Sequence, residues 1–199
     1  MKDKKIFKLV ELAILIALVV LLQLFVGNIR VGATNFSLVL IPIVLGAITL
    51  GPSAGALLGF TFGAITLIQG ITGQDPFTAI LLNSGLKGAI ITPLICLGKG
   101  TAAGLGAGLI YKLLKNKNGF VATIVASAAA PILNTGLFII GALFLSDVLA
   151  ANFVAEGTTV IYFLIFTASG INFITEFAVN LVASPAIHRV INAFNKGRI

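Results

Sequence analysis

Charged side chains are scarce in this sequence, since aspartate, glutamate, lysine and arginine together make up only 10% of its 199 residues. An ordinary soluble domain is about one quarter charged, so this composition excludes a protein whose whole surface faces water. Hydrophobic residues instead account for 58% of the chain, and the mean hydropathy is +1.13. The composition therefore predicts an integral membrane protein.

Residues that carry out chemistry are also rare. Cys96 is the single cysteine, which excludes an internal disulfide, and His188 is the single histidine. HExxH and GxSxG motifs are absent, since TASG at 167–170 lacks the leading glycine. PLICLGKG resembles a phosphate-binding loop, but Pro93 replaces its first glycine and no serine or threonine follows Lys99. With no acidic cluster for Mg²⁺ either, we expect no catalytic residue, no metal and no cofactor.

Six apolar segments approach or exceed the roughly 20 residues that a helix needs to cross the hydrocarbon core of a bilayer. They are Ile6–Val26, Leu38–Leu50, Ala54–Ile71, Ala89–Leu114, Phe120–Ala151 and Thr159–Ile187. The second segment is the shortest, and we expect Asn35–Ser37 to extend it to the far interface. We predict an all-α membrane protein in which residues 1–199 form one domain, a single bundle of six transmembrane helices.

The N-terminal segment has a second interpretation. MKDKKIFKLVELAILIALVVLLQLF has the basic start and apolar body of a signal peptide, and VGA at 31–33 resembles a cleavage site. Its apolar part is too long for the hydrophobic region of a signal peptide, and Arg30 lies beside the supposed cleavage site. We therefore interpret this segment as a retained first helix.

Basic residues gather before the first segment, after the fourth and after the sixth. They are Lys2, Lys4, Lys5 and Lys8, then Lys112, Lys115 and Lys117, then Arg189, Lys196 and Arg198. Six helices bring these three places to one face, and lysine and arginine mark the cytoplasmic face of a membrane protein. We predict that both termini are cytoplasmic. Because topology explains these clusters and no nucleic-acid motif is present, no nucleic-acid partner is expected.

Polar residues inside the apolar segments share a common depth. They lie about 13 to 17 residues from the cytoplasmic end of their segments, and 16 residues correspond to roughly 24 Å in a core about 30 Å thick. They are Gln23, Gln69, Lys99, Asn134, Asn172 and Glu176. Asn172, Glu176 and Asn180 repeat every four positions and form one polar stripe on the last helix. We predict a polar pocket in the outer half of the bundle, suited to a small anionic solute with hydroxyl or amide groups.

Lys99 has two interpretations, because a charge inside a membrane is costly unless it is paired or faces a cavity. In one, Lys99 pairs with Glu176 and the amides only bridge helices. In the other, Lys99 binds the solute. This second interpretation is favoured because a charged residue inside a membrane usually marks a functional site. The outer connections are longer than the inner turns and predict a lid over the pocket, with Arg30 and Asn83 as candidate lid residues.

Small residues indicate close approach between helices, since lipid provides no hydrophobic drive for helix association. Glycine recurs every four residues in two segments, at Gly51, Gly55, Gly59 and Gly63 and at Gly100, Gly104 and Gly108. We expect these glycines to serve packing within the bundle. Ala13 and Ala17 form a similar pair on the first segment. Their spacing fits packing inside the bundle and docking of a partner helix equally well.

Active transport by this chain would need a partner or an ion gradient, because no nucleotide-binding motif is present. A proton-coupled carrier could use Glu176 as the group that binds and releases the proton. Such carriers commonly contain internal repeats, and residues 1–95 do not resemble residues 96–199.

Three stretches are similar to a known family: LVLIPIVLGAITLGPSAGALLGFTFG (38–63), CLGKGTAAGL (96–105) and APILNTGLF (130–138). With the chain's size, its six predicted helices, its basic ends and Ala13-x-x-x-Ala17, they resemble the substrate-binding S-components of energy-coupling factor (ECF) vitamin transporters. The resemblance covers essentially the whole chain and is strongest to the pantothenate-specific branch.

The resemblance implies a multi-pass subunit of an ABC importer in a bacterial cell membrane. Such a subunit binds a vitamin from outside, topples, and docks on a membrane coupling subunit that sits on two cytoplasmic ATPase subunits. Ala13 and Ala17 would belong to the docking face. Lys99 would hold the carboxylate of pantothenate, while Glu176 would accept its hydroxyl groups or orient Lys99. The alternatives are another water-soluble vitamin, such as riboflavin, folate or niacin, and a self-sufficient ion-coupled carrier.

Overall fold

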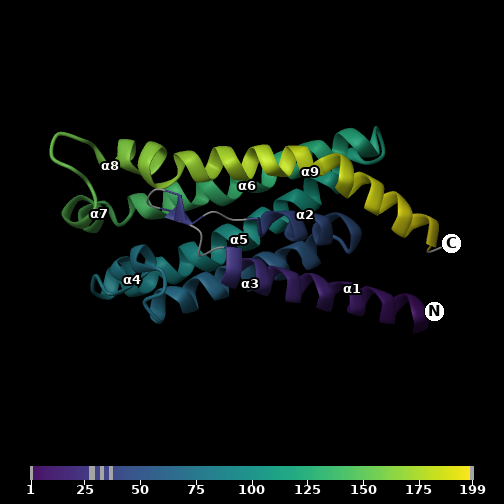
Figure 1. The fold of residues 1–199 in the computed structure, drawn as a ribbon, viewed down its shortest axis with the longest axis horizontal. Helices are drawn as coiled ribbons and strands as arrows, with labels where there is room; N and C mark the ends of the chain where they lie inside the picture. The colour runs from purple at the N-terminus through teal and green to yellow at the C-terminus, as the bar shows by residue number, and fades with distance from the viewer. Residues whose placement is uncertain (1, 27–29, 32–33, 36–37, 198–199) are drawn as a thin grey trace.

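The computed structural model describes residues 2–26, 30–31, 34–35 and 38–197, which form an elongated helical bundle (Figure 1). The elements are α1 (Lys2–Leu21), η1 (Leu22–Val26), β1 (Arg30–Val31), β2 (Thr34–Asn35), α2 (Leu40–Thr49), α3 (Pro52–Ile71), α4 (Pro76–Leu82), α5 (Leu86–Leu114), α6 (Gly119–Leu143), α7 (Ser146–Asn152), α8 (Val160–Tyr162), η2 (Phe163–Ala168) and α9 (Gly170–Gly197). α1 begins and α9 ends at the same end of the bundle, which we call the terminal end. The opposite end carries α4, α7 and α8, and we call it the lid end.

Five helical stretches among the described residues are long and apolar enough to cross a membrane. They are Lys5–Phe25, Pro52–Ile71, Leu86–Leu114, Gly119–Leu143 and Gly170–Ala193. Five of the six predicted membrane segments are thereby supported in length and composition. These helices run along the long axis of the molecule, as expected for a bundle that spans a bilayer (Figure 1).

The second predicted span is shorter than expected. Its helix, α2, has 10 residues, so its length is roughly 15 Å, about half of a hydrocarbon core. Seven of those residues are buried, which explains why α2 is apolar on every side. Asn35 does not extend this helix, because it pairs with Arg30 in the antiparallel β1–β2 ladder, and residues 36–37 lie outside the described part of the chain.

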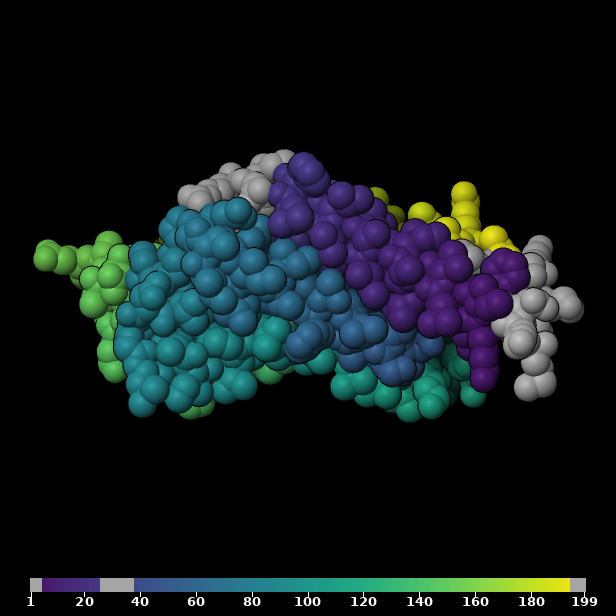
Figure 2. All heavy atoms as spheres, turned by 90° about the horizontal axis from the view of Figure 1, so that it is seen from below, coloured from purple at the N-terminus to yellow at the C-terminus, as the bar shows by residue number. Residues whose placement is uncertain are grey.

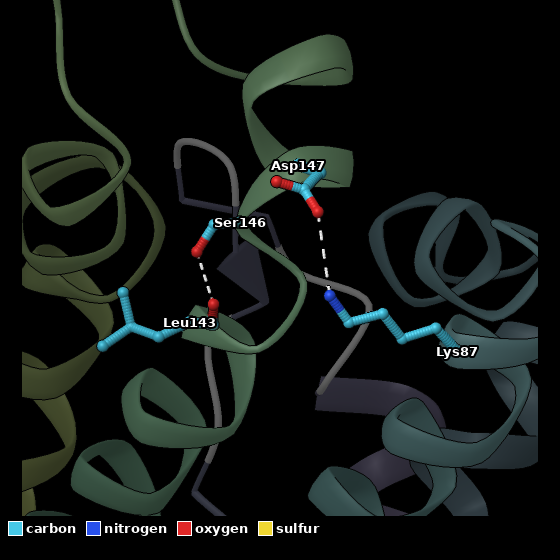
Figure 3. Close-up of polar contacts among 4 residues, drawn as sticks. All are labelled: Lys87, Leu143, Ser146 and Asp147. Atoms are coloured by element: carbon cyan, nitrogen blue, oxygen red, sulfur yellow. Dashed lines mark hydrogen bonds and ion pairs between the residues drawn. The ribbon is translucent and has the colours of Figure 1, made fainter.

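The fifth predicted segment breaks into two helices at the lid end. α6 begins at an Asn118 cap, whose Oδ1 accepts hydrogen bonds from the backbone N–H groups of Phe120 and Val121. After α6 ends, the Ser146 hydroxyl donates to the Leu143 carbonyl and α7 begins (Figure 3). Asp147 Oδ2 then lies 3.7 Å from Lys87 Nζ at the start of α5, so an exposed ion pair connects the two elements across the lid end (Figure 3).

Glycines allow α3 and α5 to pack with their backbones in contact, as the four-residue spacing predicted. Gly55 faces Gly104, Gly59 faces Gly100, and Gly63 faces the backbone of Cys96. A Cβ atom built on Gly59 would overlap the Gly100 carbonyl oxygen, so no side chain fits there. This contact fixes the position of α5 along the axis of α3. Lys99 directly precedes Gly100 in the sequence, so its backbone is held at the same level.

Candidate functional site

A cavity of about 110 Å³ lies among η1, α3, α4, α5, α6, η2 and α9. One buried water needs at least about 10–15 Å³, so this volume has room for a small organic solute. Its lining combines the aromatic rings of Phe62, Phe77 and Phe138 with charged and polar side chains. Such a mixture of apolar walls and a few polar groups is typical of small-molecule sites.

The cavity brings together most of the polar layer that residue depth predicted. Lys99 from α5, Asn134 from α6, and Asn172 and Glu176 from α9 all line it. Gln69 is buried one layer behind, and its Oε1 accepts a 2.9 Å hydrogen bond from Nε2 of Gln23, which does line the cavity. Gln69 therefore holds a lining residue in place.

Aromatic rings, rather than a carboxylate, surround the Lys99 ammonium group. Its Nζ lies 5.2 Å from the centre of the Phe138 ring and 5.7 Å from that of Phe62, within the range of cation–π attraction. Among the described residues, Lys99 forms no ion pair with Glu176 or with any other carboxylate. The structure therefore does not contain the direct Lys99–Glu176 ion pair of the first interpretation. The ammonium remains available to an anionic group in the cavity.

Glu176 and its neighbours present buried oxygen atoms to the same cavity. Glu176 is only 1% exposed, and its Oε1 accepts a 3.1 Å hydrogen bond from Asn172 Nδ2. Its Oε2, Asn134 Oδ1 and Asn172 Oδ1 are buried, and none of them has a hydrogen-bond partner among the residues that the structure describes. Unsatisfied buried polar atoms cost about 1–3 kcal/mol each, so donors from a bound molecule would stabilise this arrangement.

Six further polar residues line the cavity that sequence reasoning missed: Thr66, Asp75, Thr78, Thr92, Thr135 and Ser169. The hydroxyls of Thr92 and Ser169 are buried without a partner in the described part of the chain, and Asp75 Oδ2 accepts from the Thr78 hydroxyl. Helical spacing could have found two of them, because Thr92 lies seven positions before Lys99 and Ser169 three before Asn172. Asp75 had no such signal, since it lies in the connection before α4.

The two predicted lid residues, Asn83 and Arg30, have different outcomes. Asn83 ends α4 but is exposed, and its Nδ2 donates to the Ala79 carbonyl instead of reaching the cavity. Phe77, Thr78 and Leu81 of α4 cover the cavity in its place. Arg30 belongs to β1, and its side chain lies outside the described part of the structure.

Ala13 and Ala17 lie on the outer surface of α1. Both are exposed, whereas Leu15 and Val19 on the opposite side are buried against α2 and α3. Figure 2 shows α1 (purple) lying on the outside of the bundle along this face. Packing of Ala13 and Ala17 inside this bundle is thereby excluded, and their methyl groups face whatever surrounds the protein.

A comparison with protein families agrees with this architecture. Residues 7–188 match the family model described as ECF transporter, substrate-specific component. No curated protein matches the chain. The matched range contains all the cavity-lining residues and both exposed alanines of α1. A membrane bundle that encloses a polar cavity fits a subunit that binds a solute, and the chain belongs to the family of substrate-specific components of ECF transporters.

Proposed function

We propose that this substrate-specific component captures pantothenate in the cavity among α3, α5, α6 and α9. The observation that carries the proposal is the separation of Lys99 from Glu176 within one cavity. Pantothenate has a carboxylate for the Lys99 ammonium, and two hydroxyls and an amide for the unpartnered oxygens of Glu176, Asn134 and Asn172. Charge-assisted hydrogen bonds are stronger than neutral ones, so Lys99 would contribute the largest single share of affinity.

In the proposed arrangement, the lid end faces the cell exterior and the terminal end faces the cytoplasm. The basic residues near both termini and after α5 support this orientation. α4 covers the cavity at the lid end, so the vitamin would enter there. Because the sequence contains no nucleotide-binding motif, we propose that two ATPase subunits supply the energy through a membrane coupling subunit.

The exposed face of α1 supports docking on that coupling subunit. Ala13 and Ala17 leave space for a neighbouring helix to approach closely, while exposed Val10, Ile14 and Leu18 provide apolar contact around them. Docking through this face would leave the cavity lining untouched, since no residue of α1 itself lines the cavity.

Calorimetric titration of the purified protein with pantothenate and with pantothenol tests the assignment. Pantothenol keeps the hydroxyls and the amide but replaces the carboxylate with an alcohol. Wild-type protein should bind pantothenate about ten- to hundred-fold more tightly, corresponding to roughly 1.5–3 kcal/mol. Lys99→Met should bind both compounds with similar affinity. Equal binding of both compounds by the wild type, or tighter binding of riboflavin, folate or niacin, would contradict the assignment.

A self-sufficient ion-coupled carrier is the second candidate, because Glu176 is a buried carboxyl group in the cavity. Uptake in cells that lack their own ATPase module separates the two. Our proposal requires that uptake appears only when a coupling subunit and ATPases are supplied. Uptake by this chain alone, abolished by an uncoupler, would favour the carrier.

A further inference from the structure

Asp75 adds a second carboxylate to the cavity, which binding of an anion at Lys99 does not explain. It lies in the connection before α4, is partly buried, and lines the cavity together with Lys99 and Glu176. Among the described residues that line the cavity, two carboxylates therefore accompany one ammonium group. Their positions along the bundle decide which part of a solute each of them contacts.

The glycine contact between α3 and α5 gives the level of Asp75 relative to Lys99. The two helices are antiparallel and Gly59 faces Gly100, so the Lys99 backbone lies about one residue beyond Gly59 on the side of the lid end. The Asp75 N–H donates a 3.0 Å hydrogen bond to the carbonyl of Gln69, about nine residues further along α3. At 1.5 Å per residue, the Asp75 backbone is roughly 14 Å closer to the lid end than that of Lys99.

Contacts with α3 and α4 hold Asp75 at this level. Its Oδ2 accepts a hydrogen bond from the Thr78 hydroxyl. Thr78 is buried and packs directly on α3, because a Cβ atom added to Gly70 would overlap the Thr78 side chain. Together with the backbone hydrogen bond to Gln69, these contacts fix the carboxylate against the end of α3.

No cation compensates the Asp75 carboxylate among the described residues. The one ion pair that they contain joins Lys87 Nζ to Asp147 Oδ2 at 3.7 Å, and Lys87 does not line the cavity (Figure 3). Charges interact more strongly in a partly dehydrated cavity than in water, because the effective dielectric constant is lower. Asp75 therefore makes the lid-end part of the cavity unfavourable for an anionic group.

We propose that Asp75 determines the specificity of the cavity by excluding solutes that carry a second anionic group. The inference rests on the proposed function, in which Lys99 binds the carboxylate of pantothenate. The hydroxyl end of the vitamin then points toward the lid end. There the Asp75 carboxylate accepts a hydrogen bond from a neutral hydroxyl and repels a phosphate attached to it. Binding sites commonly combine an attractive contact for the right ligand with a repulsive contact against the wrong one.

Calorimetric titrations with three compounds test the proposal. They are pantothenate, the phosphate ester of its terminal hydroxyl, and the dimethyl ester of that phosphate, which is at least as bulky but has an uncharged phosphate group. The measured quantity is the affinity for the dimethyl ester relative to that for the free phosphate, because this ratio reports charge rather than size. Wild-type protein should prefer the dimethyl ester.

Asp75→Asn removes the charge and keeps an oxygen that can accept from the Thr78 hydroxyl, so the protein should fold. The preference for the dimethyl ester should fall by about tenfold or more, because the repulsion between like charges is gone. If Asp75→Asn fails to fold, Asp75→Ser removes the same charge and keeps a residue type suited to the start of a helix.

Glu156→Gln is the matched control. Glu156 is an exposed carboxylate between α7 and α8 at the lid end and does not line the cavity. Its replacement removes one negative charge from the same end of the molecule. The preference for the dimethyl ester should therefore stay as in the wild type.

Two results would overturn the role of Asp75 and leave the pantothenate assignment intact. One is wild-type protein that binds the free phosphate as tightly as its dimethyl ester, and the other is an Asp75→Asn protein with the wild-type preference. The role is also refuted if neither protein binds the free phosphate, because size would then exclude it without Asp75. Wild-type protein that does not bind pantothenate would refute the proposed function and this inference with it.

Discussion

The contact between α3 and α5 and the contact between α6 and α9 are built in opposite ways. α3 and α5 meet through glycines, and their backbones lie so close that not even a Cβ atom fits at Gly59. α6 and α9 meet through buried polar side chains, several of which have an oxygen atom with no hydrogen-bond partner among the described residues. In a membrane both solutions work, because association depends on close packing and hydrogen bonding rather than on a hydrophobic effect.

The difference divides the binding site into a fixed wall and an adjustable one. The backbone contact holds α5, and with it Lys99, at one height against Phe62 of α3. The side chains of α6 and α9 can instead exchange hydrogen-bond partners with a solute or with water without moving the helices. Three predictions test this division and one tests the docking face of α1, in order of decreasing expected effect.

Replacement of Gly59 by leucine should prevent folding. The side chain would enter the space of the Gly100 carbonyl, and the unfolding free energy should fall by more than about 3 kcal/mol, the upper end of typical overpacking costs. Gly98→Ala is the matched control on α5, since nothing lies within 4 Å of its added Cβ atom. The yield of monodisperse protein and thermal unfolding measure both. A stable Gly59→Leu protein would mean that the α3–α5 contact adjusts, which contradicts a fixed wall.

Ala13→Leu combined with Ala17→Leu should abolish ATP-dependent uptake and pull-down of the coupling subunit, because larger side chains keep a partner helix away. Vitamin binding by the isolated subunit should stay intact, since both alanines lie on the outer face of α1. Calorimetry on the lone subunit and uptake by the assembly are the two measurements. Loss of binding together with uptake would contradict a role of these positions in docking alone.

Lys99→Met should weaken pantothenate binding by about ten- to hundred-fold, because a charge-assisted hydrogen bond contributes roughly 1.5–3 kcal/mol. Folding should survive, since methionine has a similar length and its burial costs less. Titration calorimetry gives the affinity. Unchanged binding would place the carboxylate elsewhere, and Arg30 would be the next residue to test.

Asn134→Leu and Asn172→Leu should each weaken vitamin binding by about tenfold or less, the effect of one neutral hydrogen bond of roughly 1 kcal/mol. Asn180→Leu should have a smaller effect, because Asn180 does not line the cavity. Expression levels control for folding. Equal losses at all three positions would indicate that these amides mainly hold α6 and α9 together.

The sequence predicted the part of this site that depends on long helices. Depth within a membrane follows from residue count at a fixed rise, so residue numbers alone could place Lys99, Asn134, Asn172 and Glu176 in one layer. The glycine repeats likewise predicted close packing, because the spacing of small residues is a local property of each helix.

Features that depend on tertiary packing could not be predicted in this way. The short α2, the break after α6 and the position of α4 over the cavity depend on contacts between segments that are distant in sequence. The same holds for the side chains: residue depth cannot show that Lys99 lies beside the rings of Phe62 and Phe138 instead of pairing with Glu176. Asp75 was missed because a connection has no periodicity from which to reason.

Native mass spectrometry of the purified protein tests the central claim most directly, because it identifies the molecule that the cavity holds. We predict that wild-type protein carries a bound species with the mass of pantothenate, and that Lys99→Met, purified in parallel, has lost it. A bound species without an anionic group, or the same occupancy in wild type and Lys99→Met, would contradict the account.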